Sequence, residues 1–267
     1  MSLQHLESLR SAELKKVLIT LSELKSNMDR GKLKVLEIGA GTGCQARELA
    51  ENGYAVEAID ILDSTYLEDR VWPIRNYDGK HIPFTSNSFD IVFSSNVLEH
   101  IPHLDEFHSE MQRVLKPDGI AIHIVPSASW KFWTILTHYC FVFTSVIKIL
   151  RNRICINSKK EMNIELSRVF DRATRQSRIQ LVRKVLFPSR HGEAGDALTE
   201  VYYLSRHRWI KLFKTSGWEV RKVVPNRLFY TGYMVLDSNL PIELRRYISS
   251  FLGSSCHIFV LAKQRVS

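Results

Sequence analysis

The 267-residue sequence lacks the paired cysteines that structural zinc sites and disulfide frameworks need. Its four cysteines are scattered as Cys44, Cys140, Cys155 and Cys256, and no CxxC pair occurs among them. A secretory signal pattern is also missing, because leucines and charged residues alternate from the first residues onward. We therefore expect a cytoplasmic protein that is not secreted and whose thiols are reduced. We also expect no metal site.

Two phosphate-binding motifs are absent as well. A P-loop requires Gly-Lys-Ser/Thr after its glycines, and this tripeptide does not follow the glycine cluster at residues 39–43. A dinucleotide-binding turn spaces its glycines as G-x-G-x-x-G, but Cys44 stands where the third glycine belongs. The spacing therefore disfavours a nicotinamide dinucleotide as ligand.

The stretch LEIGAGTGCQARELA, residues 36–50, places three glycines between an apolar run and the start of a predicted helix. Glycine admits positive φ and lets a ligand approach the main chain closely. The helix N-terminus offers free N–H groups, so strand, turn and helix together predict a nucleotide-type cradle. Glu37, two residues before Gly39, suits a cationic amino group on the ligand better than it suits a pyrophosphate.

Short apolar runs alternate with helix-like stretches, which predicts parallel β-α-β units. After residue 125 the alternation stops, and it resumes with a helix that Ser205 caps and Gly217 ends. The predicted strands cover residues 34–38, 55–59, 89–94, 120–125, 218–224 and 256–263, with an amphipathic helix at 104–115. The predicted parts are an N-terminal helical cap (1–30), a core (31–125), a helical basic insertion or lid (126–204) and the completion of the core (205–267).

LEIGAGTG resembles the E/D-x-G-x-G-x-G motif of class I S-adenosylmethionine-dependent methyltransferases. IPF and FDIV in segment 77–101, and the turn LKPDG at 115–119, are similar to the family's motifs around strands four and five. The likeness covers residues 31–125 strongly and 205–263 weakly, and is closest to the small-molecule branch of quinone and sugar methyltransferases. It implies a Rossmann-like, doubly wound seven-stranded α/β sheet with strand seven antiparallel, and S-adenosylmethionine as cofactor.

The resemblance also implies which residues hold this cofactor. Asp60, at the end of the second strand, resembles the acid that binds both ribose hydroxyls, and Asp78 resembles the residue that contacts the adenine amine. Without the resemblance, Asp60 fits a solvated acid and Asp78 an ordinary Asp-Gly turn. The implied set is Glu37, Gly39, Ala40, Gly41, Gly43, Asp60, Ile61, Asp78, Gly79, Ser95 and Asn96, and the last two also face the acceptor.

The acceptor decides whether a base is needed. A hydroxyl acceptor benefits from a base with a near-neutral pKa, usually histidine, whereas carbon and amine nucleophiles need no strong base. His191 lies in a glycine-bearing loop just before the chain rejoins the core, and we predict that it acts in acceptor binding or catalysis. His100 is the weaker candidate, since its position also fits a packing histidine. Glu200, Tyr202 and Tyr203 are further acceptor candidates.

The basic charge is confined to one segment. Residues 148–190 hold twelve basic and three acidic side chains, which accounts for the whole net charge of +9. Residues 130–150 contain 14 apolar residues among 21, and the other seven fall within an arc of about 140° of a helix. This amphipathic pattern has three explanations: packing on the core or on a second copy of the chain, an interfacial helix on an anionic membrane, or a membrane span.

These patterns predict a methyltransferase with a small-molecule or lipid-linked acceptor, with O-methylation of a sugar or glycan precursor preferred. The alternatives are C-methylation of a quinone-type lipid and a non-catalytic cofactor-binding protein recruited through the basic insertion. Nucleic acid is not the expected partner, because the NPPY-like and Pro-Cys motifs of base-modifying methyltransferases do not occur. Peripheral contact with the inner face of a membrane through residues 130–190, and a homodimer, stay open.

Overall fold

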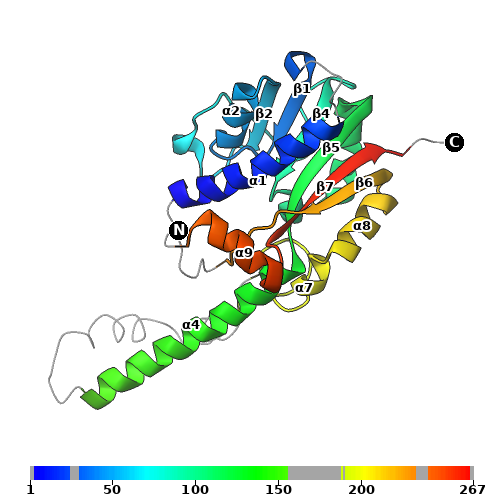
Figure 1. The fold of residues 1–267 in the computed structure, drawn as a ribbon. Coiled ribbons are helices and arrows are strands. Elements are labelled where there is room, and N and C mark those ends of the chain that lie inside the picture. Colours follow the sequence, from blue (N-terminus) through cyan, green and yellow to red (C-terminus); the bar gives the residue numbers. More distant parts are fainter. Residues whose placement is uncertain (1–2, 25–29, 156–187, 189, 233–239, 265–267) are drawn as a thin grey trace.

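The computed structural model describes residues 3–24, 30–155, 188, 190–232 and 240–264 (Figure 1). Its centre is a seven-stranded sheet in the order β3-β2-β1-β4-β5-β7-β6. The pairs from β3 to β5 are parallel, and β7 is antiparallel to both β5 and β6, which confirms the predicted sheet. The strands are β1 (Lys34–Ile38), β2 (Ala55–Ile61), β3 (Arg75–Tyr77), β4 (Phe89–Ser95), β5 (Leu115–Pro126), β6 (Trp218–Pro225) and β7 (Cys256–Lys263).

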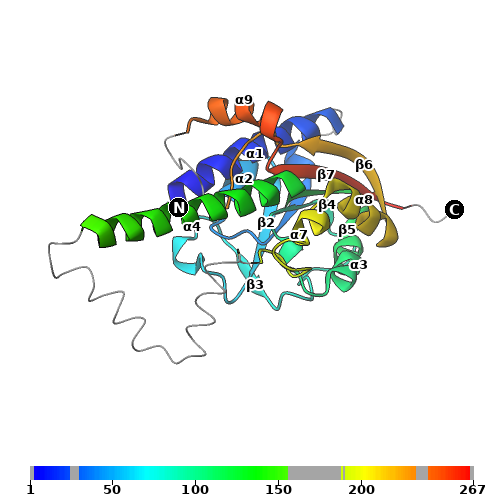
Figure 2. The same cartoon turned by 90° about the horizontal axis from the view of Figure 1, so that it is seen from below.

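Helices flank this sheet on both sides. In Figure 2, α1 and α9 lie on one side of the sheet and α3 lies on the other. Ser205 accepts a hydrogen bond from the backbone N–H of Arg208 and so caps α8 as predicted, and Gly217 follows that helix with φ of 78°. The helices are α1 (Leu3–Leu24), α2 (Cys44–Glu51), α3 (Leu104–Val114), α4 (Ala128–Cys155), α7 (Glu200–Tyr203), α8 (Arg206–Thr215) and α9 (Ile242–Leu252).

The central strands are apolar because helices cover both of their faces. Val35, Ile91, Ile122 and Val260, on four different strands, are each 0% exposed. A sheet that is buried on both sides gives continuous apolar runs rather than alternation, which is why runs such as KVLEI and IAIHIV mark the strands.

Three elements differ from the expected ones. The apolar runs do not mark β3, because it is three residues long and buries only Tyr77. The helix α9 was not predicted. The expected turn LKPDG lies within β5, whose pairing with β4 shifts register between Phe89 and Ile91.

Directly after β5, α4 leaves the sheet domain and extends well beyond it (Figure 1). This helix contains the predicted amphipathic stretch 130–150. None of the described helices is long and apolar enough to cross a membrane. Residues 156–187 of the predicted insertion lie outside the described residues, and the predicted domain boundaries stay predictions.

Candidate functional site

The glycine turn joins β1 to α2, and all three glycines have positive φ: 68° at Gly39, 57° at Gly41 and 79° at Gly43. A Cβ at Gly39 would lie 2.4 Å from Cγ2 of Val97, and a Cβ at Gly43 would lie 2.6 Å from Cβ of Trp72. These two glycines are therefore required for packing within the chain. At Gly41 the nearest atom, in the Tyr66 ring, would be 3.4 Å away, so this residue has the most room on its Cβ side.

A cavity of about 160 Å³ opens on this turn, and we call it the turn cavity. Its walls include the predicted residues Gly39, Ala40, Gly41, Ser95 and Asn96. The remaining wall comes largely from α1 through Leu3, Leu6, Glu7 and Arg10, which places the N-terminal cap over the predicted cofactor site.

Asp60 is the last residue but one of β2, and its side chain is turned toward the glycine turn. Its Oδ2 accepts hydrogen bonds from the backbone N–H of Gly41 at 2.9 Å and from Oγ of Ser64 at 3.0 Å. Oδ1 accepts from the backbone N–H of Ile61 at 2.8 Å. The carboxylate is 7% exposed and does not line the turn cavity, so it holds the turn as built, and its ribose-binding role stays a prediction.

Asp78 and Gly79 follow β3, next to the end of β2. A Cβ at Gly79 would lie 3.4 Å from Cγ2 of Ile61, so these two predicted residues are neighbours. The Asp78 carboxylate accepts from the backbone N–H groups of Lys80 and His81 and pairs with Nδ1 of His81 at 2.7 Å. These hydrogen bonds hold its pKa well below the usual range. The structure therefore shows Asp78 as a turn residue, outside the turn cavity.

Glu37 is buried beneath the turn at 2% exposure. Burial, with a smaller contribution from the nearby Asp60 charge, raises its pKa to about 8. Its Oε2 has no hydrogen-bond partner among the described residues. A buried carboxylate oxygen without a partner fits a cationic ammonium group, as a bound amino acid moiety would supply. The glycine turn and the Glu37 carboxylate at this end of the sheet therefore fit S-adenosylmethionine.

A second and larger cavity, of about 580 Å³, adjoins the turn cavity, and we call it the acceptor cavity. The two share Leu6, Arg10, Tyr66 and Asn96 in their walls. Both predicted histidines, His100 and His191, line it, together with Trp130, Lys131, Thr134, Pro188, Arg190 and Tyr230 among others. Residues from the core and from both ends of the predicted insertion thus meet at one cavity.

The two histidines lie against each other, with ring centroids 4.7 Å apart. The His100 side chain is 44% exposed, and its role as a base or as a packing residue stays a prediction. Burial of part of the ring lowers the pKa of His100, which favours the neutral imidazole that a general base requires. The His191 ring is also held against the indole of Trp130, at 4.5 Å between centroids.

Glu99 is a site residue that the sequence analysis missed. Its Oε1 lies 3.8 Å from Nε2 of His100 and 3.8 Å from Nε2 of His191, and its side chain is 1% exposed. Neither carboxylate oxygen has a hydrogen-bond partner within the described ranges. The ligand atoms of these three side chains all lie within 4.8 Å of one another. Glu99 therefore faces both imidazoles, and its charge partly offsets the lowering of the His100 pKa by burial.

Glu200 positions the loop that carries His191. Its Oε1 accepts hydrogen bonds from the backbone N–H groups of His191 at 2.7 Å and Gly192 at 2.6 Å. The predicted role of Glu200 in acceptor binding is therefore an indirect one. Tyr202 is 56% exposed, and neither it nor Tyr203 lines the acceptor cavity.

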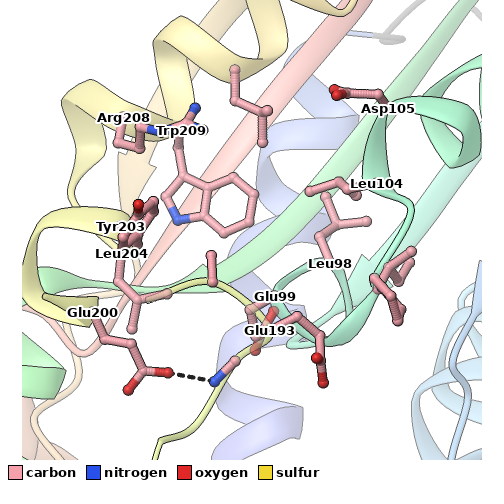
Figure 3. A pocket seen from close by; sticks show the side chains of 15 residues that line it. Leu98, Glu99, Leu104, Asp105, Glu193, Glu200, Tyr203, Leu204, Arg208 and Trp209 are labelled. Carbon is pink, nitrogen blue, oxygen red and sulfur yellow. Dashed lines mark hydrogen bonds between the residues drawn. The ribbon is translucent and has the colours of Figure 1, made fainter. Parts of the chain in front are cut away.

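A third cavity, of about 250 Å³, lies behind Glu99 between α3 and α8 (Figure 3). Leu98, Leu104 and Trp209 form much of its apolar wall, and Glu99 and Glu200 lie at its lower end in this view. Tyr203 borders it rather than the acceptor cavity. The third cavity does not touch the glycine turn, so it is not part of the cofactor site.

Comparison with known proteins shows which proteins this chain resembles. Residues 36–123 match the family model described as a methyltransferase domain. The ubiquinone biosynthesis O-methyltransferase of Rickettsia prowazekii is 33% identical over 110 residues, covering 38% of this chain and 44% of that protein. The ubiquinone/menaquinone biosynthesis C-methyltransferase of Cupriavidus pinatubonensis is 34% identical over 109 residues, covering 37% and 45%. The matched segment thus spans less than half the length of these relatives.

Solved structures share the fold over most of the chain. A chain from the complex between the Haloferax volcanii Trm112 methyltransferase activator and the putative methyltransferase superposes with a TM-score of 0.51 at 12% identity, covering 93% of this chain and 89% of that chain. Phosphoethanolamine N-methyltransferase 2 of Haemonchus contortus superposes with a TM-score of 0.50 at 16% identity, covering 94% and 53%. At these identities the likeness shows the fold alone.

Proposed function

Because residues 36–123 are a methyltransferase domain of the class I S-adenosylmethionine-dependent type, we propose that the chain transfers a methyl group to a hydroxyl oxygen of a lipid-type acceptor. S-adenosylmethionine supplies an electrophilic methyl group on its sulfonium. The backbone from Gly39 to Gly41 would hold it in the turn cavity, and Glu37 would face its amino group. Asp60 and Asp78 would hold the ribose and adenine ends, as the resemblance implies.

The observation that carries the proposal is the pair of imidazoles in the cavity that adjoins the turn cavity. A hydroxyl nucleophile must lose its proton as the new bond to carbon forms, and a histidine near neutral pKa accepts it well. His191 would take this proton, with His100 beside it and Glu99 stabilising the imidazolium that results. The walls from α1 and α4 would exclude water and hold the oxygen in line with the methyl group.

The relatives bear on the choice of acceptor. The sequence alone favoured a sugar, with a quinone-type lipid as the alternative. Most of the curated relatives are named for ubiquinone, menaquinone or sterol methylation, and one is a biotin biosynthesis protein, so they support the lipid alternative over the sugar. Both O- and C-methyltransferases occur among them. The histidine pair is our reason for preferring oxygen, since a carbon acceptor has less need of a base.

Two measurements test this function. Titration calorimetry with S-adenosylmethionine, S-adenosylhomocysteine and NAD should give heat with the first two only. Transfer of a labelled methyl group should then be measured with a hydroxylated ubiquinone-type ring, a menaquinone-type ring and a lipid-linked sugar. We expect transfer to the hydroxyl of the first. Transfer to ring carbon would select C-methylation, and heat with NAD alone would refute the cofactor assignment.

A transfer assay with a metal chelator tests whether the histidines and Glu99 bind a metal ion or whether His191 acts as a base. Glu99, His100 and His191 are near enough to one another to ligate a divalent cation. If EDTA abolishes transfer and a divalent metal restores it, these residues act as metal ligands and the base role of His191 is wrong. Activity that persists in EDTA supports the base.

A further inference from the structure

One side of α4 exposes a continuous row of large apolar side chains. Phe132, Leu136, Tyr139, Phe143 and Ile147 are between 38% and 66% exposed. At about 100° per residue these five positions fall within an arc of about 80° and extend along roughly 22 Å of helix. We call this row the outer stripe.

Near the start of α4, the side opposite the outer stripe faces the protein and carries three buried polar residues. Lys131, Thr134 and His138 are 1%, 8% and 5% exposed. Lys131 forms an ion pair with Glu200, and Oγ1 of Thr134 accepts a hydrogen bond from the backbone N–H of Gly232 at 2.8 Å. A helix packed on a core usually turns its apolar side inward. Here buried polar residues face the protein and the apolar stripe faces outward. Packing on the core, one of the three explanations from the sequence, is wrong for the outer stripe.

A second exposed aromatic group lies near the start of this stripe. The rings of Tyr247 and Phe251 on α9 are 5.3 Å apart, and these residues are 65% and 72% exposed. The end of α9 is attached to α4, because the carbonyl of Leu252 accepts a hydrogen bond from Nε1 of Trp133 at 2.8 Å. Exposed large apolar side chains therefore occur on two helices that are hydrogen-bonded to each other.

We propose that the outer stripe, together with Tyr247 and Phe251, docks on the headgroup region of an anionic lipid bilayer. Aromatic and aliphatic side chains along one face of a helix suit burial in that region. The charge of the chain fits the same partner, because α4 contains no Asp or Glu and leads into the segment 148–190, which carries the whole net positive charge. Two copies of the chain that met through their outer stripes would instead bring two segments of like charge together.

This proposal rests on the proposed function and deepens it. The inner side of α4 supplies Trp130, Lys131 and Thr134 to the acceptor cavity, while the outer stripe faces away from it. One helix thus has a lipid-facing side and a cavity-facing side. An acceptor that is anchored in the bilayer by a lipid chain would enter the cavity along this helix, and a freely soluble acceptor would gain nothing from the docking.

Flotation of the full-length protein with lipid vesicles tests the docking. Vesicles of phosphatidylcholine alone are compared with vesicles that also contain phosphatidylglycerol, at low and at high salt. The test variant is Phe143→Ser, and the matched control is Phe141→Ser. These phenylalanines are 66% and 63% exposed, and the helix places Phe141 on the side opposite the outer stripe. Thermal unfolding checks that each variant is folded.

We expect the wild type and F141S to float with the anionic vesicles, less so at high salt, and F143S to bind about tenfold more weakly. Equal flotation of F143S and wild type, or equal binding to both vesicle types, would overturn the proposal. So would a concentration-dependent dimer in analytical ultracentrifugation that F143S abolishes, since the stripe would then bind a second copy. A failure of the proposed function can be told apart from a failure of the docking proposal. In the first case calorimetry with S-adenosylmethionine would give no heat, while the protein would still float with anionic vesicles.

Discussion

Lys131 of α4 and Glu200 of α7 form an ion pair inside the protein, and each side chain is only 1% exposed. The same Glu200 carboxylate holds the backbone of His191 and Gly192 through its other oxygen. One buried acid therefore attaches the extended helix to the histidine loop at the acceptor cavity. A buried charge that loses its partner is costly, which makes this pair testable.

Replacing Glu200 by Ala should destabilise the chain by about 3–5 kcal/mol, because Lys131 is left as an uncompensated buried charge. Chemical denaturation measures the free energy of unfolding. The double variant Lys131→Met with Glu200→Leu should recover part of this loss, since no lone charge remains buried. If E200A is as stable as the wild type, the pair is not formed in solution.

Replacing Asp60 by Asn should weaken S-adenosylmethionine binding about 10- to 100-fold, because a charged hydrogen-bond acceptor for the ribose hydroxyls is lost. Calorimetry measures the Kd, and Asp63→Asn is the control, since Asp63 is an exposed acid three residues further on. An unchanged Kd with lowered thermal stability would show that Asp60 only holds the glycine turn through Gly41.

Replacing Glu37 by Gln should flatten the dependence of stability on pH. The folded-state pKa of Glu37, about 8, lies above the ordinary glutamate value of 4.5, so the native protein binds the extra proton. Stability from this group is present at low pH and falls as pH rises from about 4.5 to 8, by up to about 1.4 kcal/mol per pH unit. Denaturation at several pH values should show this fall in the wild type and not in E37Q.

Two buried histidines change the free energy of unfolding with pH in the opposite direction to Glu37. Burial lowers the pKa of His123 to about 3 and that of His108 to about 4, so the folded protein binds fewer protons than the unfolded chain. Stability from these groups is present above about pH 6.5 and is lost as pH falls toward 4. Below about pH 6.5, the free energy of unfolding of His123→Gln should fall less steeply with decreasing pH than that of the wild type. His207→Gln, at an exposed position, should leave this dependence unchanged.

Replacing His191 by Ala should lower kcat about 10²- to 10⁴-fold while the Kd for S-adenosylmethionine stays the same. Glu99→Gln should also lower kcat, but by less, because it removes the carboxylate charge that would stabilise the imidazolium formed during transfer. His207→Ala is again the control. Equal kcat in H191A and wild type would remove this histidine from the mechanism.

The local motifs were predictable because they depend on neighbouring residues. Three alternating glycines after an apolar strand indicate a turn with positive φ, and all three have it. The short strand β3 gave no signal, since Tyr77 is its only buried residue. Glu99 was missed for a different reason: nothing in LEHI shows that His191, from a remote loop, will lie beside its carboxylate.

The sequence by itself determined the strands and helices other than β3 and α9, the glycine turn and the amphipathic pattern of residues 130–150, because backbone preference and burial of apolar runs act over a few residues. Only the tertiary structure decided that the apolar side of α4 faces outward. Periodicity states which side chains share a face of a helix, but the side that turns inward depends on partners far along the chain. Here those partners are Glu200, which pairs with Lys131, and Gly232, whose backbone N–H donates a hydrogen bond to Thr134, and they leave the aromatic side of α4 uncovered.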